Sequence, residues 1–249
     1  MSPLETQSLN TTTSDDEDYV TWKNWGQNNF GILSAKDSQY FSAEIKKTKQ
    51  SFGPGSSVLE IGFGNGNFLQ FAKSRGWNVC GVEINENLVK VANDNQFNAF
   101  HTKDLSIFDS QAFDLVVAFD VLEHIPKDKI LSFLSEIKRI LKPNGCFIAR
   151  FPNGDSPFGL SHQNGDMTHV HFIGSGKVRY FVSKLQVELI HIGGEATPFN
   201  QTFNPILYIA RIFKKIFMKT ISYFFHRVFL KSDFSSNLIM IFKKPHMND

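Results

Sequence analysis

The segment with the clearest chemical meaning is a glycine-rich stretch that follows a short apolar run. After the apolar residues 57–61, glycines recur at every second position, at Gly62, Gly64 and Gly66. Glycine lets the backbone turn tightly and lets a ligand approach closely, and a helix that begins after the loop offers free N–H groups. The pattern predicts a binding loop for a polar ligand between a strand and a helix.

Two details of this loop indicate which ligand it binds. The dinucleotide fingerprint G-x-G-x-x-G needs a third glycine at the position where this sequence has Asn67. Glu60, near the end of the preceding strand, would repel a pyrophosphate, whereas it suits the ammonium group of a methionine moiety. The loop therefore favours a ligand with an amino-acid end over NAD.

Acidic residues after the next two apolar runs could bind the rest of such a ligand. Glu83, followed by Ile84, has the spacing from the loop at which a carboxylate accepts hydrogen bonds from ribose hydroxyls. Asp104 can accept a hydrogen bond from an adenine amino group, and Leu105 can pack on the ring. The plainer interpretation of each acid is a solvent-exposed surface charge.

Residues that could act on a second substrate lie in two other segments. Asp120 and His124 follow the fourth apolar run, at the sheet edge where open α/β sheets bind ligands. A stretch rich in Gly, Asn and His carries Asp166, Thr168, His169 and His171. His124 or either histidine of this stretch could take a proton from an acceptor hydroxyl, with Asp166 orienting the ring. The alternatives without catalysis are a polar cap for His124 and a hydrogen-bonded loop scaffold for the four residues of the stretch.

The elements that must position these residues alternate between strands and helices. Apolar runs predict strands at 57–61, 78–84, 99–101, 113–119, 146–151, 187–192 and 238–242. Helical spacing predicts helices at 67–74, 86–95, 127–141 and 175–185, with a turn at 143–145 and a loop at 152–173. This alternation implies a parallel sheet covered by helices on both faces.

Together these motifs resemble a known family. E-I-G-F-G-N-G at 60–66, Glu83, F-D-V-L-E-H at 119–124 and L-K-P-N-G at 141–145 stand in the order found in class I S-adenosylmethionine-dependent methyltransferases. The resemblance spans residues 57–151. It implies an α/β fold: a Rossmann-like, doubly wound, seven-stranded, mostly parallel sheet with an antiparallel last strand, here with an amphipathic helical insertion.

The resemblance also implies a role for each matching residue. The methionine part of the cofactor is lined by Glu60, Gly62, Gly64 and Gly66, the ribose by Glu83 and Ile84, the adenine by Asp104 and Leu105, and the methyl group by Asp120. Because S-adenosyl-L-methionine carries the activated methyl group, the protein mainly positions the acceptor. His124, His169 and Asp166 are the candidate catalytic residues.

A metal site is an alternative for part of this set. Asp120, Glu123 and His124 resemble the run that some quinone O-methyltransferases use to bind a divalent ion, and carboxylates and imidazole in one short turn allow it. We predict methyl transfer without a metal.

The segments outside residues 57–151 resemble a narrower group of methyltransferases. Residues 22–41, the stretch 164–172 and a basic C-terminal insertion are similar to methyltransferases of bacterial surface-polysaccharide and lipid-linked sugar synthesis. The resemblance implies O-methylation of a sugar or a lipid-linked saccharide. Methylation of a small metabolite or quinone is one alternative, and a non-catalytic, membrane-attached protein that keeps the cofactor pocket is another.

The insertion at 199–231 has an uneven charge distribution. Between Glu195 and Asp233 there are six basic residues and no acid. On a helical projection of 205–230 the apolar and basic residues fall on opposite sides, which predicts a helix lying on an anionic membrane surface. The basic residues keep every apolar run too short to cross a bilayer. Packing on the chain's own domain or on a second subunit is the alternative.

Composition sets the remaining limits. A formal charge of only +2 over 249 residues argues against a chain that binds nucleic acid through its overall charge. We expect a disordered tail at 1–18, a helical preface at 19–52 and the methyltransferase domain at 53–249. Cys80 and Cys146 are predicted to be reduced and buried. No signal peptide is visible, so we expect a cytoplasmic protein that attaches peripherally to the inner face of the membrane.

Overall fold

A computed structural model describes the core of the chain. The described residues are Lys23, Trp25, 28–196, 235–246 and, between 209 and 224, positions 209, 210, 213, 216, 217, 220, 221, 223 and 224. The predicted tail at 1–18 and most of the predicted insertion at 199–231 lie outside the described residues.

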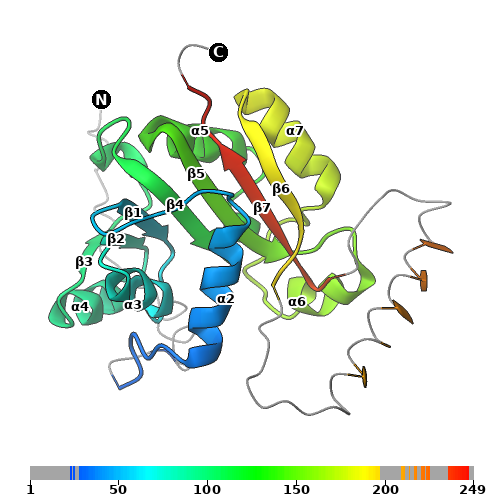
Figure 1. The fold of residues 1–249 in the computed structure, drawn as a ribbon, viewed down its shortest axis with the longest axis horizontal. Helices are drawn as coiled ribbons and strands as arrows, with labels where there is room; N and C mark the ends of the chain where they lie inside the picture. Colours follow the sequence, from blue (N-terminus) through cyan, green and yellow to red (C-terminus); the bar gives the residue numbers. More distant parts are fainter. Residues whose placement is uncertain are drawn as a thin grey trace, which may run out of the picture.

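Seven strands form one sheet in the order β3-β2-β1-β4-β5-β7-β6 (Figure 1). They are β1 (Ser57–Ile61), β2 (Asn78–Glu83), β3 (Asn98–His101), β4 (Phe113–Phe119), β5 (Leu141–Pro152), β6 (Glu188–Gly194) and β7 (Asn237–Lys243). The first five strands pair in parallel, and β7 runs antiparallel to both β5 and β6. The predicted fold class is therefore confirmed.

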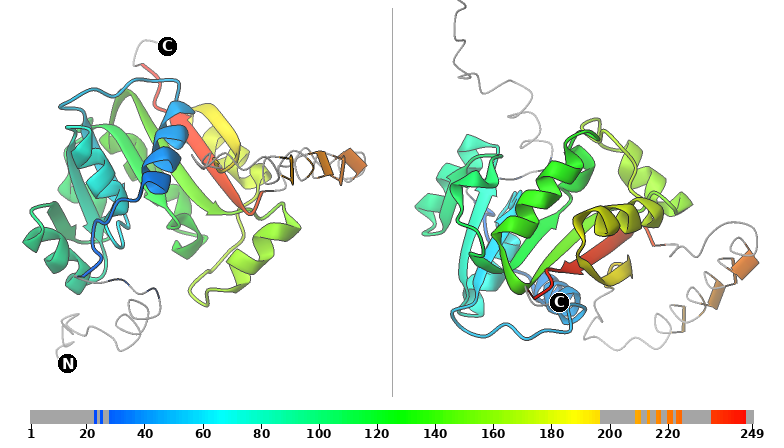
Figure 2. Two further views of the ribbon diagram at one scale, coloured as in Figure 1. Left: turned by 60° about the horizontal axis from the view of Figure 1, so that its bottom comes forward. Right: turned by 90° about the horizontal axis from the view of Figure 1, so that it is seen from above.

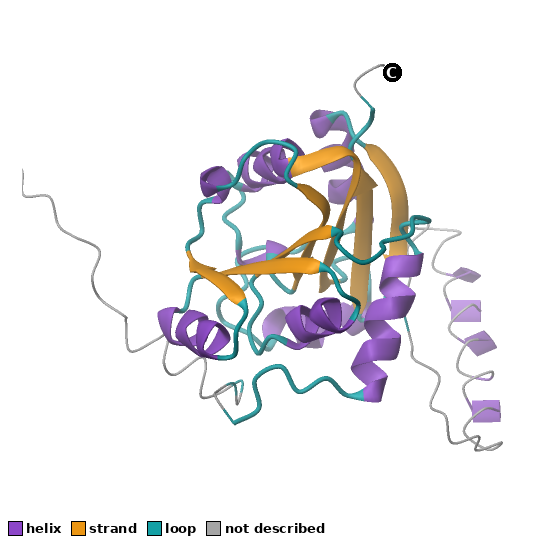
Figure 3. Cartoon of the chain, turned by 60° about the vertical axis from the view of Figure 1, so that its left-hand side comes forward, coloured by secondary structure: helices purple, strands orange, loops and turns teal. Residues whose placement is uncertain are grey.

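Helices cover both faces of this sheet (Figures 2 and 3). The α-helices are α2 (Ala35–Lys46), α3 (Asn67–Ser74), α4 (Glu86–Asp94), α5 (Ile130–Ile140), α6 (Leu160–Asn164) and α7 (Ser175–Leu185). Short 3₁₀ turns are η1 (Leu105–Ile107), η2 (Leu122–His124) and η3 (Pro157–Gly159). Within the described part of the chain, no helix combines the length and apolarity needed to cross a bilayer.

The burial of strand β4 explains why residues 115–119 form a continuous apolar run. Leu115 and Val117 belong to the core cluster under α2 and α3, whereas Val116 and Ala118 belong to the cluster under α5 and α7. Successive side chains of a strand point to opposite faces, so a central parallel strand needs apolar residues at every position. The two cysteines, Cys80 and Cys146, are buried and form no disulfide, as the sequence predicts.

One sequence prediction about an element boundary is wrong. The predicted helix at 127–141 starts late, at Ile130, and ends at Ile140, because Leu141 already belongs to β5 and pairs with Phe113 of β4. Inside β5 the register shifts between Leu141 and Cys146, and Asn144 has a φ of 63°, so the backbone turns locally at the predicted turn 143–145. The N–H of Asn144 donates to the carbonyl of Lys244, and the N–H of Lys244 donates to the carbonyl of Gly145.

The predicted loop at 152–173 contains two short helical elements. Ser156 caps η3, where its hydroxyl accepts a hydrogen bond from the N–H of Phe158. Helix α6 follows directly, with Gln163 buried on its inner side. A five-residue helix is too short to show helical periodicity, which is why the sequence pattern did not predict it.

The segment before α2 packs on the glycine loop. The N–H of Gly31 donates to the carbonyl of Asn65 at 2.8 Å, and the Asn65 side chain donates to the carbonyl of Asn29 at 2.7 Å. The Phe30 ring lies against Gly66, whose φ of 71° places it in the left-handed region at the start of α3. This segment therefore holds the loop that the sequence predicts to bind the ligand.

We expect Gly66→Ala to destabilise the protein more than Gly55→Ala. Both glycines have positive φ, so each alanine carries a backbone penalty of about 1–2 kcal/mol. A Cβ at Gly66 would also lie 2.4 Å from the Phe30 ring, whereas a Cβ at Gly55 meets nothing within 4 Å. Crowding of this kind costs about 1–3 kcal/mol, measurable by urea unfolding. Equal losses would show that Phe30 does not constrain the loop.

Candidate functional site

The glycine loop joins β1 to α3 as predicted. Gly62, Gly64 and Gly66 all have positive φ, at 67°, 48° and 71°. A Cβ at Gly62 would lie 2.7 Å from the side chain of Val121, the second residue after β4. The loop thus approaches the exit of β4 closely, and only glycine fits this backbone without strain.

Two buried carboxylates lie at this loop. Glu60 is 4% exposed, its Oε2 atom has no hydrogen-bond partner, and burial raises its pKa well above the usual range. Glu83 accepts hydrogen bonds from the N–H groups of Gly64 at 3.1 Å, Ile84 at 2.8 Å and Asn85 at 3.3 Å. A buried oxygen without a partner calls for a donor, and the ammonium group of a methionine moiety supplies one. These residues fit the cofactor that the sequence resemblance implies.

The remaining predicted cofactor residues, Asp104, Leu105 and Ile84, differ in burial and hydrogen bonding. Asp104 is exposed and caps η1, because it accepts from the N–H of Ser106 at 2.9 Å and from its hydroxyl at 2.7 Å. These hydrogen bonds lower the pKa of Asp104. Leu105 is buried in the main core and Ile84 is 63% exposed. Contact of Asp104 and Leu105 with adenine stays a prediction.

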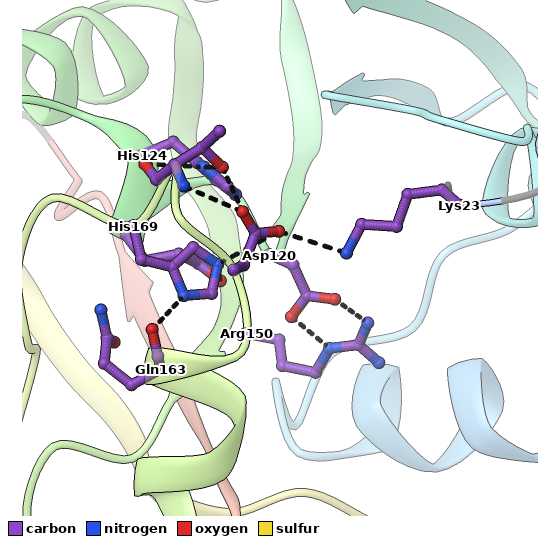
Figure 4. A network of polar contacts seen from close by, with 9 residues as sticks. Lys23, Asp120, His124, Arg150, Gln163 and His169 are labelled. Carbon is purple, nitrogen blue, oxygen red and sulfur yellow. Dashed lines mark hydrogen bonds and ion pairs between the residues drawn. The ribbon is translucent and has the colours of Figure 1, made fainter. Parts of the chain in front are cut away.

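Asp120 forms a tight turn where β4 ends. Its φ is 57°, and its N–H donates to the carbonyl of Arg150 at 2.9 Å. Arg150 donates two hydrogen bonds to the Asp120 carboxylate, from Nε to Oδ1 at 2.9 Å and from Nη2 to Oδ2 (Figure 4). It also donates to the Tyr40 hydroxyl at 3.1 Å and packs over the rings of Tyr40 and Phe119. The predicted role of Asp120 near the methyl group stays a prediction.

The structure brings the three predicted catalytic residues together. The turn η2 carries His124, and residues 165–173, here called the acceptor loop, carry Asp166 and His169. The two imidazole rings meet edge to face with centroids 4.7 Å apart (Figure 4). The N–H of Val170 donates to the carbonyl of Glu123 at 2.9 Å, which ties the acceptor loop to η2.

These two segments, together with α6 and the ends of β4, β5 and β7, line a pocket of about 270 Å³. Its lining residues are Lys23, Asp120, Glu123, His124, Pro152, Ser161, His162, Gly165, Asp166, His169 and Asn237. The sequence analysis had not singled out Lys23, which forms an ion pair with Asp166 at 3.3 Å (Figure 4). It had also missed Arg150, because its role depends on the pairing of β5 with β4 at Phe119.

The two carboxylates of the pocket have opposite protonation behaviour. Burial, followed by the nearby charge of Asp120, raises the pKa of Glu123 to about 8. Glu123 is 1% exposed, and neither carboxylate oxygen has a hydrogen-bond partner. Burial also raises the pKa of Asp166, but hydrogen bonds from Thr168 and Lys23 outweigh it and lower the value to about 2. Asp166 is therefore the ionised group of the pair at neutral pH.

A divalent ion would find donors in the same pocket. Glu123, His124 and His169 each offer one atom, and these atoms lie within 4.8 Å of one another. His169 thus replaces Asp120 in the set suggested by the sequence, because Arg150 binds both oxygens of Asp120. The prediction that no metal takes part stays a prediction.

A comparison with protein families identifies the core of the chain. A family model described as a methyltransferase domain matches residues 34–189. The ubiquinone biosynthesis O-methyltransferase of Coxiella burnetii is 30% identical over 98 residues. That match covers 36% of this chain and 41% of the relative, so it spans less than half of the relative's length.

Solved structures share the fold at low sequence identity. A SAM-dependent methyltransferase from Archaeoglobus fulgidus has a TM-score of 0.60 and 21% identity, over 83% of this chain and 94% of that chain. Phosphoethanolamine N-methyltransferase 2 of Haemonchus contortus, solved in complex with S-adenosyl-L-methionine, has a TM-score of 0.59 and 18% identity. That alignment covers 95% of this chain and 59% of the other.

The family match runs from the start of α2 into β6 and takes in the glycine loop, η2 and the acceptor loop. It covers more than half of the chain. The chain therefore belongs to this methyltransferase domain family.

Proposed function

We propose that this enzyme methylates a hydroxyl oxygen of a sugar or a lipid-linked saccharide. The observation that carries the proposal is the pocket beside the glycine loop, in which every lining residue except Pro152 and Gly165 is polar or charged. An acceptor with many hydroxyl groups can satisfy such walls, whereas a mostly apolar ring would leave them unpaired. The resemblance of the segments outside residues 57–151 to enzymes of surface-polysaccharide synthesis favours the same acceptor class.

The proposed chemistry assigns the proton transfer to His124. When bound, S-adenosyl-L-methionine supplies an electrophilic methyl group; transfer forms an O–CH₃ bond and leaves the broken C–S electron pair on sulfur. His124 accepts the proton that the acceptor hydroxyl loses. The Nε2 atom of His169 lies 3.9 Å from Glu123 and 3.8 Å from Asp166, so His169 helps to position the side chains that line the pocket. Burial, followed by the nearby His169, lowers the pKa of His124, which favours the neutral ring that can accept a proton.

A quinone or other small phenolic metabolite is the second candidate acceptor. The ubiquinone relative favours it, as do the exposed apolar side chains on the segment that lines the pocket. These side chains are Phe158, Leu160, Met167, Val170 and Phe172. They could contact the apolar tail of a quinone or that of a lipid-linked saccharide, so the two candidates differ in the group that enters the pocket.

Transfer of a labelled methyl group from S-adenosyl-L-methionine distinguishes the acceptors. We expect label in a saccharide or lipid-linked saccharide and none in a catechol precursor of a quinone. His124→Gln should lower kcat about 100-fold or more by removing the base, with unchanged affinity for S-adenosylhomocysteine. His246→Gln, at an exposed position near the C-terminus, serves as the control. Label only in the catechol would replace the first candidate with the second. Cofactor binding with no methylation of any acceptor would favour the non-catalytic alternative.

The buried carboxyl of Glu123 predicts a pH-dependent stability. Its pKa is about 8 in the folded chain, against about 4.3 in an unfolded one. Between these values the unfolded chain loses a proton that the folded chain keeps, so stability falls as pH rises. We expect Glu123→Gln to gain stability over the wild type from pH 5 to 8, by at most about 1.4 kcal/mol per pH unit, and no further gain above pH 8.

Thermal unfolding across this pH range, after dialysis against EDTA, measures the effect. A difference that does not change with pH would show that Glu123 is ionised in the folded protein. Zn²⁺ would hold Glu123 ionised if the ion bound there. A slope that disappears when Zn²⁺ is added would therefore identify the pocket as a metal site and overturn the prediction of metal-free methyl transfer.

We also propose that residues 205–230 bind an anionic membrane surface. Apolar residues in the described part of this segment are well exposed, from Ile209 at 54% to Phe224 at 71%. They are Ile209, Phe213, Ile216, Phe217, Tyr223 and Phe224. Burial of these side chains in a bilayer interface, with the basic residues at the lipid headgroups, would stabilise attachment.

Replacing Lys214, Lys215 and Lys219 with Glu should release the protein from vesicles that contain phosphatidylglycerol. Reversal of three charges removes roughly 1 kcal/mol or more per residue of attraction to the surface. A triple change of the exposed Lys90, Lys129 and Lys184 to Glu alters the net charge equally and should leave binding nearly intact. Co-sedimentation measures both. Equal release by the two variants would mean that net charge alone drives attachment.

A further inference from the structure

A continuous chain of hydrogen bonds joins Asp166 to His124 through Thr168. The Thr168 hydroxyl donates to Oδ1 of Asp166 at 2.5 Å, and the Thr168 N–H donates to the same oxygen at 3.0 Å. The hydroxyl oxygen lies 3.0 Å from Nδ1 of His124. Thr168 therefore stands between a carboxylate of the acceptor loop and the imidazole on η2.

The direction of these hydrogen bonds sets the tautomer of His124. The hydroxyl has one hydrogen and donates it to Oδ1 of Asp166, whose other oxygen pairs with Lys23. The hydroxyl oxygen must then accept from Nδ1–H of His124. The backbone carbonyl of Thr168 lies 3.3 Å from the same nitrogen and can also only accept. The ring proton is thus on Nδ1, and the lone pair is on Nε2.

Other contacts hold the acceptor loop without the Thr168 hydroxyl. Oδ2 of Asp166 lies 3.3 Å from Nζ of Lys23, and the backbone N–H of residue 168 still donates to Oδ1. His169 is anchored separately, since its Nδ1 lies 3.0 Å from the carbonyl of Gln163 (Figure 4). Loss of the hydroxyl should therefore weaken the link to His124 and leave the acceptor loop folded.

We propose that Thr168 is a positioning residue for methyl transfer: its hydroxyl couples Asp166 to Nδ1 of His124 and leaves Nε2 free to take the acceptor proton. This inference rests on the proposed function. As His124 takes the proton it becomes an imidazolium, and the Nδ1–H bond strengthens because Asp166 stabilises the positive charge through the hydroxyl.

Nuclear magnetic resonance of the histidine rings tests the coupling without any acceptor. The full chain, labelled with ¹⁵N-histidine and saturated with S-adenosylhomocysteine, is compared as wild type, Thr168→Ser and Thr168→Val. The His124 signals are assigned by their absence in His124→Gln. We expect wild type and Thr168→Ser to hold the proton on Nδ1. Thr168→Val should move the ring towards a mixture of tautomers, since only the more distant carbonyl remains. Unchanged His124 signals in Thr168→Val would overturn the proposal.

Kinetics with a methylated acceptor give the second readout. Thr168→Val should lower kcat about 10-fold, less than loss of the base itself, with little change in KM, and Thr168→Ser should restore most of the rate. Ser132→Ala is the control, because that hydroxyl donates to the carbonyl of Lys129 on the exposed side of α5. An unchanged kcat in Thr168→Val would contradict a positioning role.

The two readouts separate this inference from the proposed function. If the wild type methylates no hydroxylated acceptor, the proposed function fails, while the ring signals still report whether Thr168 sets the tautomer. Affinity for S-adenosylhomocysteine and the unfolding temperature confirm that each variant is folded. Thr168→Ala gives the same comparison if valine is not accommodated.

Discussion

The ion pair between Asp120 and Arg150 fixes the point at which β4 leaves the sheet. A left-handed backbone costs a non-glycine residue about 1–2 kcal/mol, and here a double hydrogen bond to a side chain of β5 offsets that cost. The turn places Val121 against Gly62 of the glycine loop and directs η2 towards the acceptor loop. The glycine loop and the pocket lined by η2 and the acceptor loop therefore meet at the end of β4.

The two carboxyl groups of the pocket, Asp166 and Glu123, have different protonation states because their environments differ. Asp166 is ionised because Thr168 and Lys23 donate to it, while Glu123 has no donor and burial favours its neutral form. Because the pKa values of the two groups differ in this way, Asp166 can stabilise positive charge while Glu123 adds no negative charge to the pocket. His169 lies between them, and Thr168 links Asp166 to His124.

Much of the fold was predictable because local patterns determine it. Buried parallel strands such as β4 require continuous apolar residues, and the glycines of the loop have backbone angles that other residues rarely adopt. The sequence also singled out His124, His169 and Asp166 and placed Thr168 in the same loop group, but the hydrogen bonds of Thr168 and the role of Arg150 depend on contacts made only when distant segments meet. The helix predicted to reach Leu141 ends one residue earlier for the same reason, since Leu141 pairs with Phe113 of β4.

A crystal structure of the complex with S-adenosylhomocysteine tests most directly whether the two sites meet at the end of β4. We predict that the homocysteine amino group contacts Oε2 of Glu60 and that the sulfur opens into the pocket lined by His124 and His169. A hydroxyl acceptor would then lie between sulfur and Nε2 of His124. A cofactor whose sulfur points away from that pocket, with Glu60 still unpaired, would contradict the assignment of the acceptor site and of His124 as the base.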